Sequence, residues 1–238
     1  MKLTTVLFDL DGTLLPMEDL EHFTKTYLGA LTQYLAANGY DAEQAGRGVW
    51  AGILAMFQND GTRTNEEVFW DAFSAYFGEE LRRDMPIFER FYLEKFDDVS
   101  AVCGYTPRAK ETVAYARSKG FRVVLATNPA FPAIATEKRM RWAGLEPEDF
   151  DLYTAYEDSH SCKPHLRYYE EVLKRLGATA EECLMVGNDV RDDMVAEQLG
   201  MRVFLLTDFL INRDGVDISR YPHGGYDELM KYLEENCG

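Results

Sequence analysis

From about residue 102 onward, apolar segments alternate with segments of helical periodicity, and this alternation restricts the fold more than any other feature of the chain. Strands and helices that alternate in this way form a mostly parallel sheet that helices cover on both faces. Strands are expected at residues 121–126, 150–155, 183–186 and 202–206, and helices at residues 106–120, 132–143, 164–176, 192–199 and 226–235. We therefore expect an α/β fold.

One more apolar segment, residues 3–8, is expected to join the same sheet. The block that follows it, residues 19–97, is rich in aromatic residues and almost free of strand signals, with helices expected at residues 18–38, 42–57, 64–76 and 85–96. Apolar residues at helical spacing predict a bundle core of Phe23, Tyr27, Leu31, Trp50, Leu54, Phe69, Trp70 and Phe73. We expect two domains: an α/β core of residues 1–15 and 101–238, and a helical domain of residues 16–100 inserted after the first strand.

The composition excludes several kinds of partner. A net charge of −16 argues against nucleic acid and acidic membranes, because phosphate groups are bound by a surplus of Lys and Arg. No segment reaches the roughly 18 apolar residues of a membrane span, and no signal-peptide pattern is present. The four cysteines lack CxxC or zinc-ligand spacing and are expected to be reduced thiols: Cys103, Cys162, Cys183 and Cys237. These features favour a soluble cytoplasmic protein.

The first strand ends at two carboxylates, Asp9 and Asp11, followed by Gly12. In open α/β sheets this end of a strand is where ligands bind. Two acids this close repel each other, and a divalent cation bound through oxygen atoms is the simplest compensation. Taken alone, the motif is equally consistent with an Asp-rich turn in which Gly12 supplies a positive φ.

Three other strand ends carry side chains that suit an anion or a cation. Thr127 and Asn128 follow the second strand and suit a phosphate oxygen. Lys163, before Pro164 at an expected helix start, suits neutralisation of an anion. The acidic loop 187–193 follows the strand at residues 183–186. The dipole of the following helix would favour the acids Asp192 and Asp193 at its start, but it does not account for Asp189. The carboxyl ends of these strands are expected to meet in one crevice.

Together the four motifs resemble those of the haloacid dehalogenase (HAD) superfamily, in the same order: Asp9-Leu10-Asp11-Gly12-Thr13, Thr127-Asn128, Lys163-Pro164 and the loop 187–193. The resemblance spans nearly the whole chain. It implies a Rossmann-like parallel-sheet core with a helical cap of the C1 type inserted after the first motif. The implied activity is Mg²⁺-dependent hydrolysis of a small phosphorylated metabolite, a phosphomonoester, through an aspartyl-phosphate intermediate.

The resemblance also implies roles for individual residues. Asp9 would be the nucleophile, and Asp11 would protonate the leaving oxygen and then activate water. Dehalogenase members lack an acid two residues after the nucleophile, so Asp11 argues against halide displacement. The catalytic set would include Thr127 and Lys163, and the phosphate-binding set would be Gly12, Thr127, Asn128 and Lys163.

By the same resemblance, Mg²⁺ would lie between Asp9, the carbonyl of Asp11 and an acid of the last loop. The family usually has Asp directly after the glycine of this loop, where this chain has Asn188. The spacing of Asp189 and Asp193 matches another form of the motif. We therefore expect Asp189 to bind the metal, with Asn188 or Asp193 as the alternatives.

Three other functions share these motifs. A sugar-phosphate mutase would return the phosphoryl group to a sugar hydroxyl, and a phosphonate hydrolase would need a cap lysine, for which Lys25 is the main candidate. A non-catalytic relative would bind a phosphorylated ligand without turnover. Monomer and homodimer both remain open.

Two loops complete the expectations. The polar cap loop 59–63 either faces the crevice, with Arg63 contacting the leaving group, or is a solvated connection. Residues 210–225 are expected to form a long surface loop.

Overall fold

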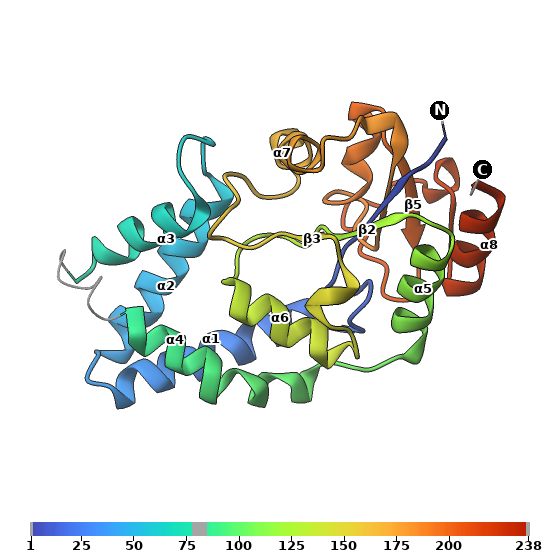
Figure 1. The fold of residues 1–238 in the computed structure, drawn as a ribbon. Coiled ribbons are helices and arrows are strands. Elements are labelled where there is room, and N and C mark those ends of the chain that lie inside the picture. The colour runs from blue at the N-terminus through green and yellow to red at the C-terminus, as the bar shows by residue number, and fades with distance from the viewer. Residues whose placement is uncertain (1, 78–84, 237–238) are drawn as a thin grey trace.

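The computed structural model describes residues 2–77 and 85–236, and the structural statements below refer to these residues (Figure 1). A six-stranded parallel sheet forms its centre, in the order β3-β2-β1-β4-β5-β6. The strands are β1 (Thr5–Phe8), β2 (Arg122–Leu125), β3 (Leu152–Tyr153), β4 (Cys183–Gly187), β5 (Arg202–Leu206) and β6 (His223–Gly224). The expected α/β fold with a parallel sheet is confirmed.

The central strands are apolar because both faces of the sheet are covered. Every residue of β1 and β4 is buried, as in parallel sheets generally. Successive side chains of β1 point to opposite faces, so Val6 and Phe8 pack in one apolar cluster and Leu7 in the other.

Four helices flank this sheet: α5 (Pro107–Ser118), α6 (Ala133–Trp142), α7 (Leu166–Leu176) and α8 (Tyr226–Asn236). Residues of α5, α6 and α8 pack in the cluster that contains Val6 and Phe8. Residues of α7 and of a 3-10 helix, Met194–Leu199, pack in the cluster that contains Leu7. None of these helices is long and apolar enough to cross a membrane, nor is any other helix in the described part of the chain.

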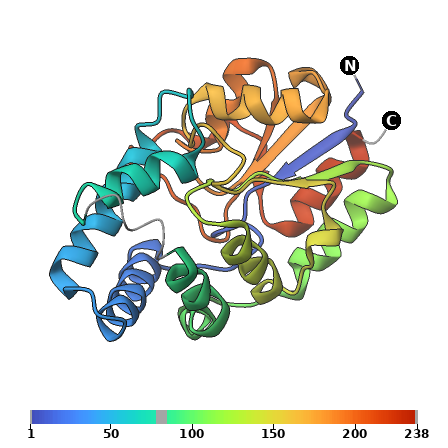
Figure 2. The same cartoon turned by 60° about the vertical axis from the view of Figure 1, so that its left-hand side comes forward.

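Four more helices follow β1 before the chain returns to the sheet: α1 (Leu20–Ala37), α2 (Ala42–Phe57), α3 (Asn65–Ser74) and α4 (Met85–Glu94). Asp19, Asp41 and Thr64 cap the first three by accepting hydrogen bonds from backbone N–H groups. In Figure 2 the arrow of β1 points toward the side of the molecule on which these helices lie. The helical block therefore faces the carboxyl ends of the strands.

The bundle core differs from the expectation at two residues of α2. Trp50 is 48% exposed and Leu54 is 42% exposed, whereas the other six expected core residues are buried. The side of α2 that meets α3 instead carries Gly48 and Gly52. A Cβ at Gly52 would lie 2.4 Å from the Phe69 ring, so the close packing of α2 on α3 requires a glycine there.

Other differences concern element boundaries. The helix expected at residues 192–199 is the 3-10 helix Met194–Leu199, and the strand expected at residues 150–155 has two residues. Helix α7 begins at Leu166 after a cis peptide bond between Lys163 and Pro164, so Pro164 is not its first residue. The expected surface loop at residues 210–225 contains β6 and a 3-10 turn, Ile218–Arg220.

Candidate active site

Asp9 lies directly after β1, at the carboxyl end of the sheet, with only 8% of its surface exposed. One carboxylate oxygen accepts a hydrogen bond from Lys163 Nζ at 2.8 Å. The other accepts one from the Thr13 hydroxyl at 3.2 Å. A backbone turn therefore presents a buried carboxylate whose two oxygens have different partners, one cationic and one neutral.

Lys163 is buried and joins two carboxylates from different strand ends. Its Nζ lies 2.8 Å from Asp9 Oδ1 and 2.7 Å from Asp193 Oδ1. Burial alone would lower the pKa of Lys163, but the carboxylates of Asp193 and Asp9 raise the pKa well above its ordinary value. The ammonium group is therefore a fixed positive charge at the bottom of the site.

Asp11 pairs with Arg139, a fully buried residue of α6. Its second oxygen, Oδ1, is buried without a hydrogen-bond partner. Burial raises the pKa of Asp11, while the Arg139 guanidinium opposes that rise. The Phe131 ring lies 4.3 Å from the guanidinium carbon and covers it. Asp11 is thus held on the α6 side of the site.

Thr127 and Asn128 follow β2, as expected. The carbonyl of Thr127 accepts hydrogen bonds from the Thr154 hydroxyl at 2.6 Å and the Tyr168 hydroxyl at 2.9 Å. The Asn128 amide oxygen accepts one from the backbone N–H of Lys163 at 3.3 Å. These contacts tie the end of β2 to the segment that carries Lys163.

Asp193, at the end of the acidic loop after β4, uses its two carboxylate oxygens for different contacts. Asp193 Oδ1 pairs with Lys163, and its Oδ2 accepts the backbone N–H of Asp189 at 3.0 Å. A Cβ at Gly187 would lie 2.1 Å from that Oδ2, so Asp193 folds back against the strand only because residue 187 is glycine. Burial raises the pKa of Asp193, while the Lys163 ammonium opposes that rise.

Asn188 and Asp189 differ in how firmly their side chains are held. The Asn188 amide donates to the Phe209 carbonyl at 2.6 Å and accepts from the Thr13 hydroxyl at 3.2 Å. Asp189 Oδ1 accepts two backbone N–H groups of its own turn. Its Oδ2 pairs at 2.8 Å with Arg213, whose side chain is 55% exposed.

One cavity of about 380 Å³ collects these groups. Its polar lining is formed by Asp9, Asp11, Thr127, Asn128, Lys163, Asn188, Asp189, Asp192, Asp193 and Arg213. A volume of this size is typical of small-molecule sites. All four sequence motifs therefore meet at one cavity beneath the helical block.

Comparison with known proteins identifies the family. The family model for haloacid dehalogenase-like hydrolases matches residues 3–200 of the 238. The chain belongs to this family. The matching model describes hydrolases, so the family assignment supports an enzyme. The expected superfamily is confirmed.

Individual relatives are more distant. Pyrophosphatase PpaX of Bacillus mycoides (strain KBAB4) is 26% identical over 202 residues, which is 85% of this chain and 82% of the relative. A HAD phosphatase from Thermococcus onnurineus matches with a TM-score of 0.57 at 22% identity, over 97% of this chain and 98% of that one. A predicted phosphoglycolate phosphatase from Haemophilus somnus 129PT also matches with a TM-score of 0.57, at 20% identity over 98% of both chains. These two structures support the fold.

Gly12, which the resemblance implies at the phosphate, and Arg63, which one of the two alternatives for the loop 59–63 places at the leaving group, lie outside the cavity lining. Gly12 has a φ of 82°, and a Cβ there would lie 2.2 Å from the Asn188 amide nitrogen, so it shapes the loop. Arg63 lies in the loop before α3, where it pairs with Asp71 of that helix at 2.6 Å and donates to the Glu67 carbonyl. The expected approach of Arg63 to the crevice is absent from the structure.

Two basic residues at this HAD-type site were not expected from the sequence. Arg139 is one of three basic residues of α6, and helical spacing alone does not say which one enters the core. Arg213 lies in the segment that was expected to be a surface loop. Its only advance signal is a position shortly after β5, where doubly wound sheets bind ligands.

The donor set of the site fits a divalent cation such as the Mg²⁺ implied by the family resemblance. Five carboxylates line the cavity against two cationic side chains, and oxygen is the ligand that Mg²⁺ prefers. Within residues 2–77 and 85–236, no three His, Cys, Asp or Glu side chains converge as a metal-binding group. A backbone carbonyl and water would therefore complete the shell, as is common for Mg²⁺.

Proposed function

We propose that this protein is a Mg²⁺-dependent phosphohydrolase that transfers the phosphoryl group of a small phosphomonoester first to Asp9 and then to water. The observation that carries the proposal is the position of Asp9, buried at the base of the cavity with Lys163 on one oxygen and the Thr13 hydroxyl on the other. A carboxylate attacks a phosphate dianion only when nearby positive charge offsets the repulsion.

In the first step, Asp9 attacks phosphorus while the bond to the leaving oxygen breaks. Lys163 stabilises the negative charge on the phosphoryl oxygens, and Thr127 and Asn128 orient them from the end of β2. Asp11 takes part in its protonated form, which burial favours by raising its pKa against the effect of Arg139, and it gives that proton to the leaving oxygen. Its Oδ1, which has no hydrogen-bond partner, is the atom available for that proton.

In the second step, water attacks the phosphorus of aspartyl-phosphate, and Asp9 is released as a carboxylate. Asp11 takes the proton from the attacking water, which restores the state in which it began. One residue thus serves both half-reactions, because the leaving oxygen and the attacking water occupy the same side of the phosphorus.

The residues proposed to hold Mg²⁺ are the Asp9 carboxylate, the Asp11 carbonyl and Asp189. When bound, Mg²⁺ would polarise the phosphoryl group and offset its charge. Asp189 is favoured over the alternatives because its Oδ2 is paired only with a half-exposed Arg213. Both oxygens of Asp189 also have partners, but no oxygen of Asn188 or Asp193 is paired only with a half-exposed side chain.

We further propose that residues 16–100 act as a cap over a core formed by residues 1–15 and 101–238. Helices α1 and α2 contribute residues to the lining of the cavity that contains Asp9. A cap in this position excludes water while the first step proceeds.

Inorganic pyrophosphate is a second candidate substrate, because the relatives from Bacillus species are named pyrophosphatases. Phosphonate cleavage is less well supported. Lys25 pairs with Glu21 at 2.6 Å, its side chain is 73% exposed, and it does not line the cavity.

The test is release of inorganic phosphate from a panel of phosphomonoesters and pyrophosphate, with Mg²⁺ or with excess EDTA. We expect release with Mg²⁺ and its loss with EDTA. An Asp9→Asn variant should lose about a thousandfold or more, whereas the matched surface variant Asp60→Asn should keep full activity. Wild-type activity in Asp9→Asn, or phosphate that moves only to another hydroxyl of the substrate, would contradict the proposal.

A further inference from the structure

Resting on the proposed function, we propose that the substrate is a phosphomonoester whose alcohol portion is apolar, so that pyrophosphate and other polyanions are poor substrates. The cavity lining is of two kinds: polar side chains from the strand ends and the loops after them, and mainly apolar side chains from α1 and α2. The phosphoryl group belongs against the polar lining, which includes Asp9 and Lys163, and the remainder of the substrate must therefore contact the apolar lining.

The apolar lining is a wall of aromatic and aliphatic side chains. Six of the side chains that form it come from helices α1 and α2: Leu20, Phe23, Tyr27, Trp50, Ile53 and Phe57. Phe131 and Ile211 extend the same wall from the core. Trp50 and Phe57 are partly exposed although they are large and apolar, and the cavity explains why. An alcohol portion that packs against this wall removes apolar surface from water on both sides.

The hydroxyl groups on this wall are already used. The Thr24 hydroxyl donates to the Leu20 carbonyl at 2.8 Å. The Tyr27 hydroxyl is bonded to the Tyr92 hydroxyl at 2.8 Å, so Tyr27 offers its ring to the cavity. A polyol or a sugar would give up bonds to water and find few partners on this wall, because its hydroxyl groups already bond within the protein.

Charge also opposes an anionic leaving group. Among the described residues that line the cavity, the cations are Lys163 and Arg213, and both are paired with carboxylates of the site. A second, more open cavity adjoins the first and shares Leu20, Thr24, Ile211 and Arg213 with it. Once Mg²⁺ takes the Asp189 oxygen, Arg213 is the one cationic side chain of the described lining that is free to meet a leaving phosphate, and it lies beside the acidic residues of the adjoining cavity.

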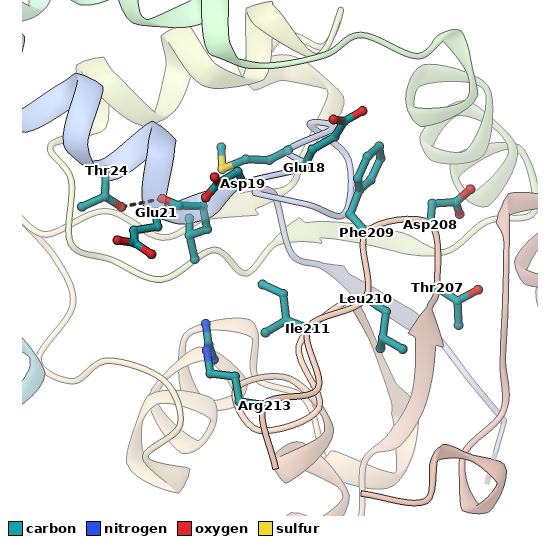
Figure 3. A pocket seen from close by; sticks show the side chains of 12 residues that line it. Glu18, Asp19, Glu21, Thr24, Thr207, Asp208, Phe209, Leu210, Ile211 and Arg213 are labelled. Atoms are coloured by element: carbon teal, nitrogen blue, oxygen red, sulfur yellow. Dashed lines mark hydrogen bonds between the residues drawn. The ribbon is translucent and has the colours of Figure 1, made fainter. Parts of the chain in front are cut away.

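Acidic residues surround the adjoining cavity. Glu18, Asp19 and Glu21 line it at the start of α1. Figure 3 shows Ile211 and Arg213 reaching from the loop after β5 toward this first turn of α1. A net acidic entrance repels polyanions and does not repel the uncharged end of an alkyl or aryl phosphate.

The inferred preference fits the proposed chemistry. As the bond between Asp9 and phosphorus forms, the bond between phosphorus and the ester oxygen breaks, and the neutral alcohol departs with the proton from Asp11. Contacts between the alcohol portion and the apolar wall persist through this step, so they stabilise the transition state and appear in kcat/KM.

The test is a substrate series for the Mg²⁺-loaded, full-length enzyme: ethyl, propyl, butyl and hexyl phosphate, with glycerol 3-phosphate and pyrophosphate. The alkyl alcohols have similar acidity, so the series isolates contact with the wall. We expect kcat/KM to rise roughly fourfold for each buried methylene group. Propyl phosphate should exceed glycerol 3-phosphate by at least tenfold, although both have three carbons, and pyrophosphate should be the poorest substrate.

A pair of variants on α2 provides the control. Trp50 lines the cavity, whereas Leu54 is similarly exposed on the same helix and does not line it. Trp50→Asp should lower kcat/KM for hexyl phosphate at least tenfold more than for ethyl phosphate. Leu54→Asp should leave the dependence on chain length unchanged.

Each outcome has a distinct meaning. Turnover of glycerol 3-phosphate or pyrophosphate in preference to the alkyl phosphates, or an alkyl series that is flat, would overturn the apolar preference and leave the phosphohydrolase intact. Equal effects of Trp50→Asp and Leu54→Asp would also overturn it. Absence of phosphate release from every compound would overturn the proposed function and the preference with it.

Discussion

Arg139 and Asp11 form an ion pair in which the arginine is completely buried and the carboxylate borders the cavity. The pair joins α6 to the turn after β1. A buried guanidinium requires a carboxylate partner, because desolvation of an unpaired charge is costly. Asp11 therefore stabilises the fold in addition to its proposed part in proton transfer.

Asp11→Asn should abolish most activity and also lower the free energy of unfolding by about 3 kcal/mol, since it leaves Arg139 buried without a counter-charge. The double variant Asp11→Asn with Arg139→Met should recover much of that stability and none of the activity. Urea unfolding and phosphate release measure the two effects separately. If the double variant is no more stable than Asp11→Asn, the ion pair is not the source of the loss.

Asp193→Asn should lower kcat roughly 10- to 100-fold with a smaller effect on stability, because Lys163 loses one of the two charges that fix its position. Asp192→Asn is the matched control, since the neighbouring carboxylate lines the same cavity without contacting Lys163. Steady-state kinetics of both variants measure the two losses in kcat. Equal losses would mean that the net charge of the loop, and not the contact with Lys163, sets the rate.

Arg213→Ala should raise the affinity for Mg²⁺ by up to about fivefold. The guanidinium occupies the Asp189 oxygen that the metal is proposed to use, and an exposed ion pair contributes up to about 1 kcal/mol. Calorimetric titration with Mg²⁺ measures this change, and Arg220→Ala, which breaks an exposed pair with Glu197, is the control. An affinity that does not change in Arg213→Ala would favour Asn188 or Asp193 as the ligand.

Gly52→Ala should destabilise the helical block by about 1–3 kcal/mol, because the new Cβ would lie 2.4 Å from the Phe69 ring. Gly29→Ala is the control: it is also a helical glycine, and no atom lies within 4 Å of its added Cβ. That change should stabilise the protein by up to about 1 kcal/mol. Thermal unfolding of the two variants should therefore shift in opposite directions.

The fold was predictable because its signals are local. Glycine at helix ends, capping residues such as Thr64, and short apolar strands each specify an element without reference to the rest of the chain. The meeting of Asp9, Lys163 and Asp193 was also predictable, because the carboxyl ends of parallel strands share one edge of the sheet.

Other features depend on packing that no local pattern reveals. Trp50 and Leu54 have the spacing of core residues, yet the glycines of α2 occupy its buried side. Arg139 enters the core, while Arg141 on the same helix pairs with Glu146 at the surface. Which of these residues is buried depends on how each helix is rotated about its axis, and that rotation is set by packing against neighbouring elements.

The central claim, that Asp9 carries the phosphoryl group, is tested most directly by trapping the phosphorylated enzyme. The wild-type protein would be mixed with Mg²⁺ and p-nitrophenyl phosphate radiolabelled on phosphorus, quenched in acid within one turnover, and digested. We predict an acid-stable label on the peptide that contains Asp9, reducible by borohydride, and no label in Asp9→Asn. A label on another residue, or hydrolysis by Asp9→Asn at the wild-type rate, would contradict the account.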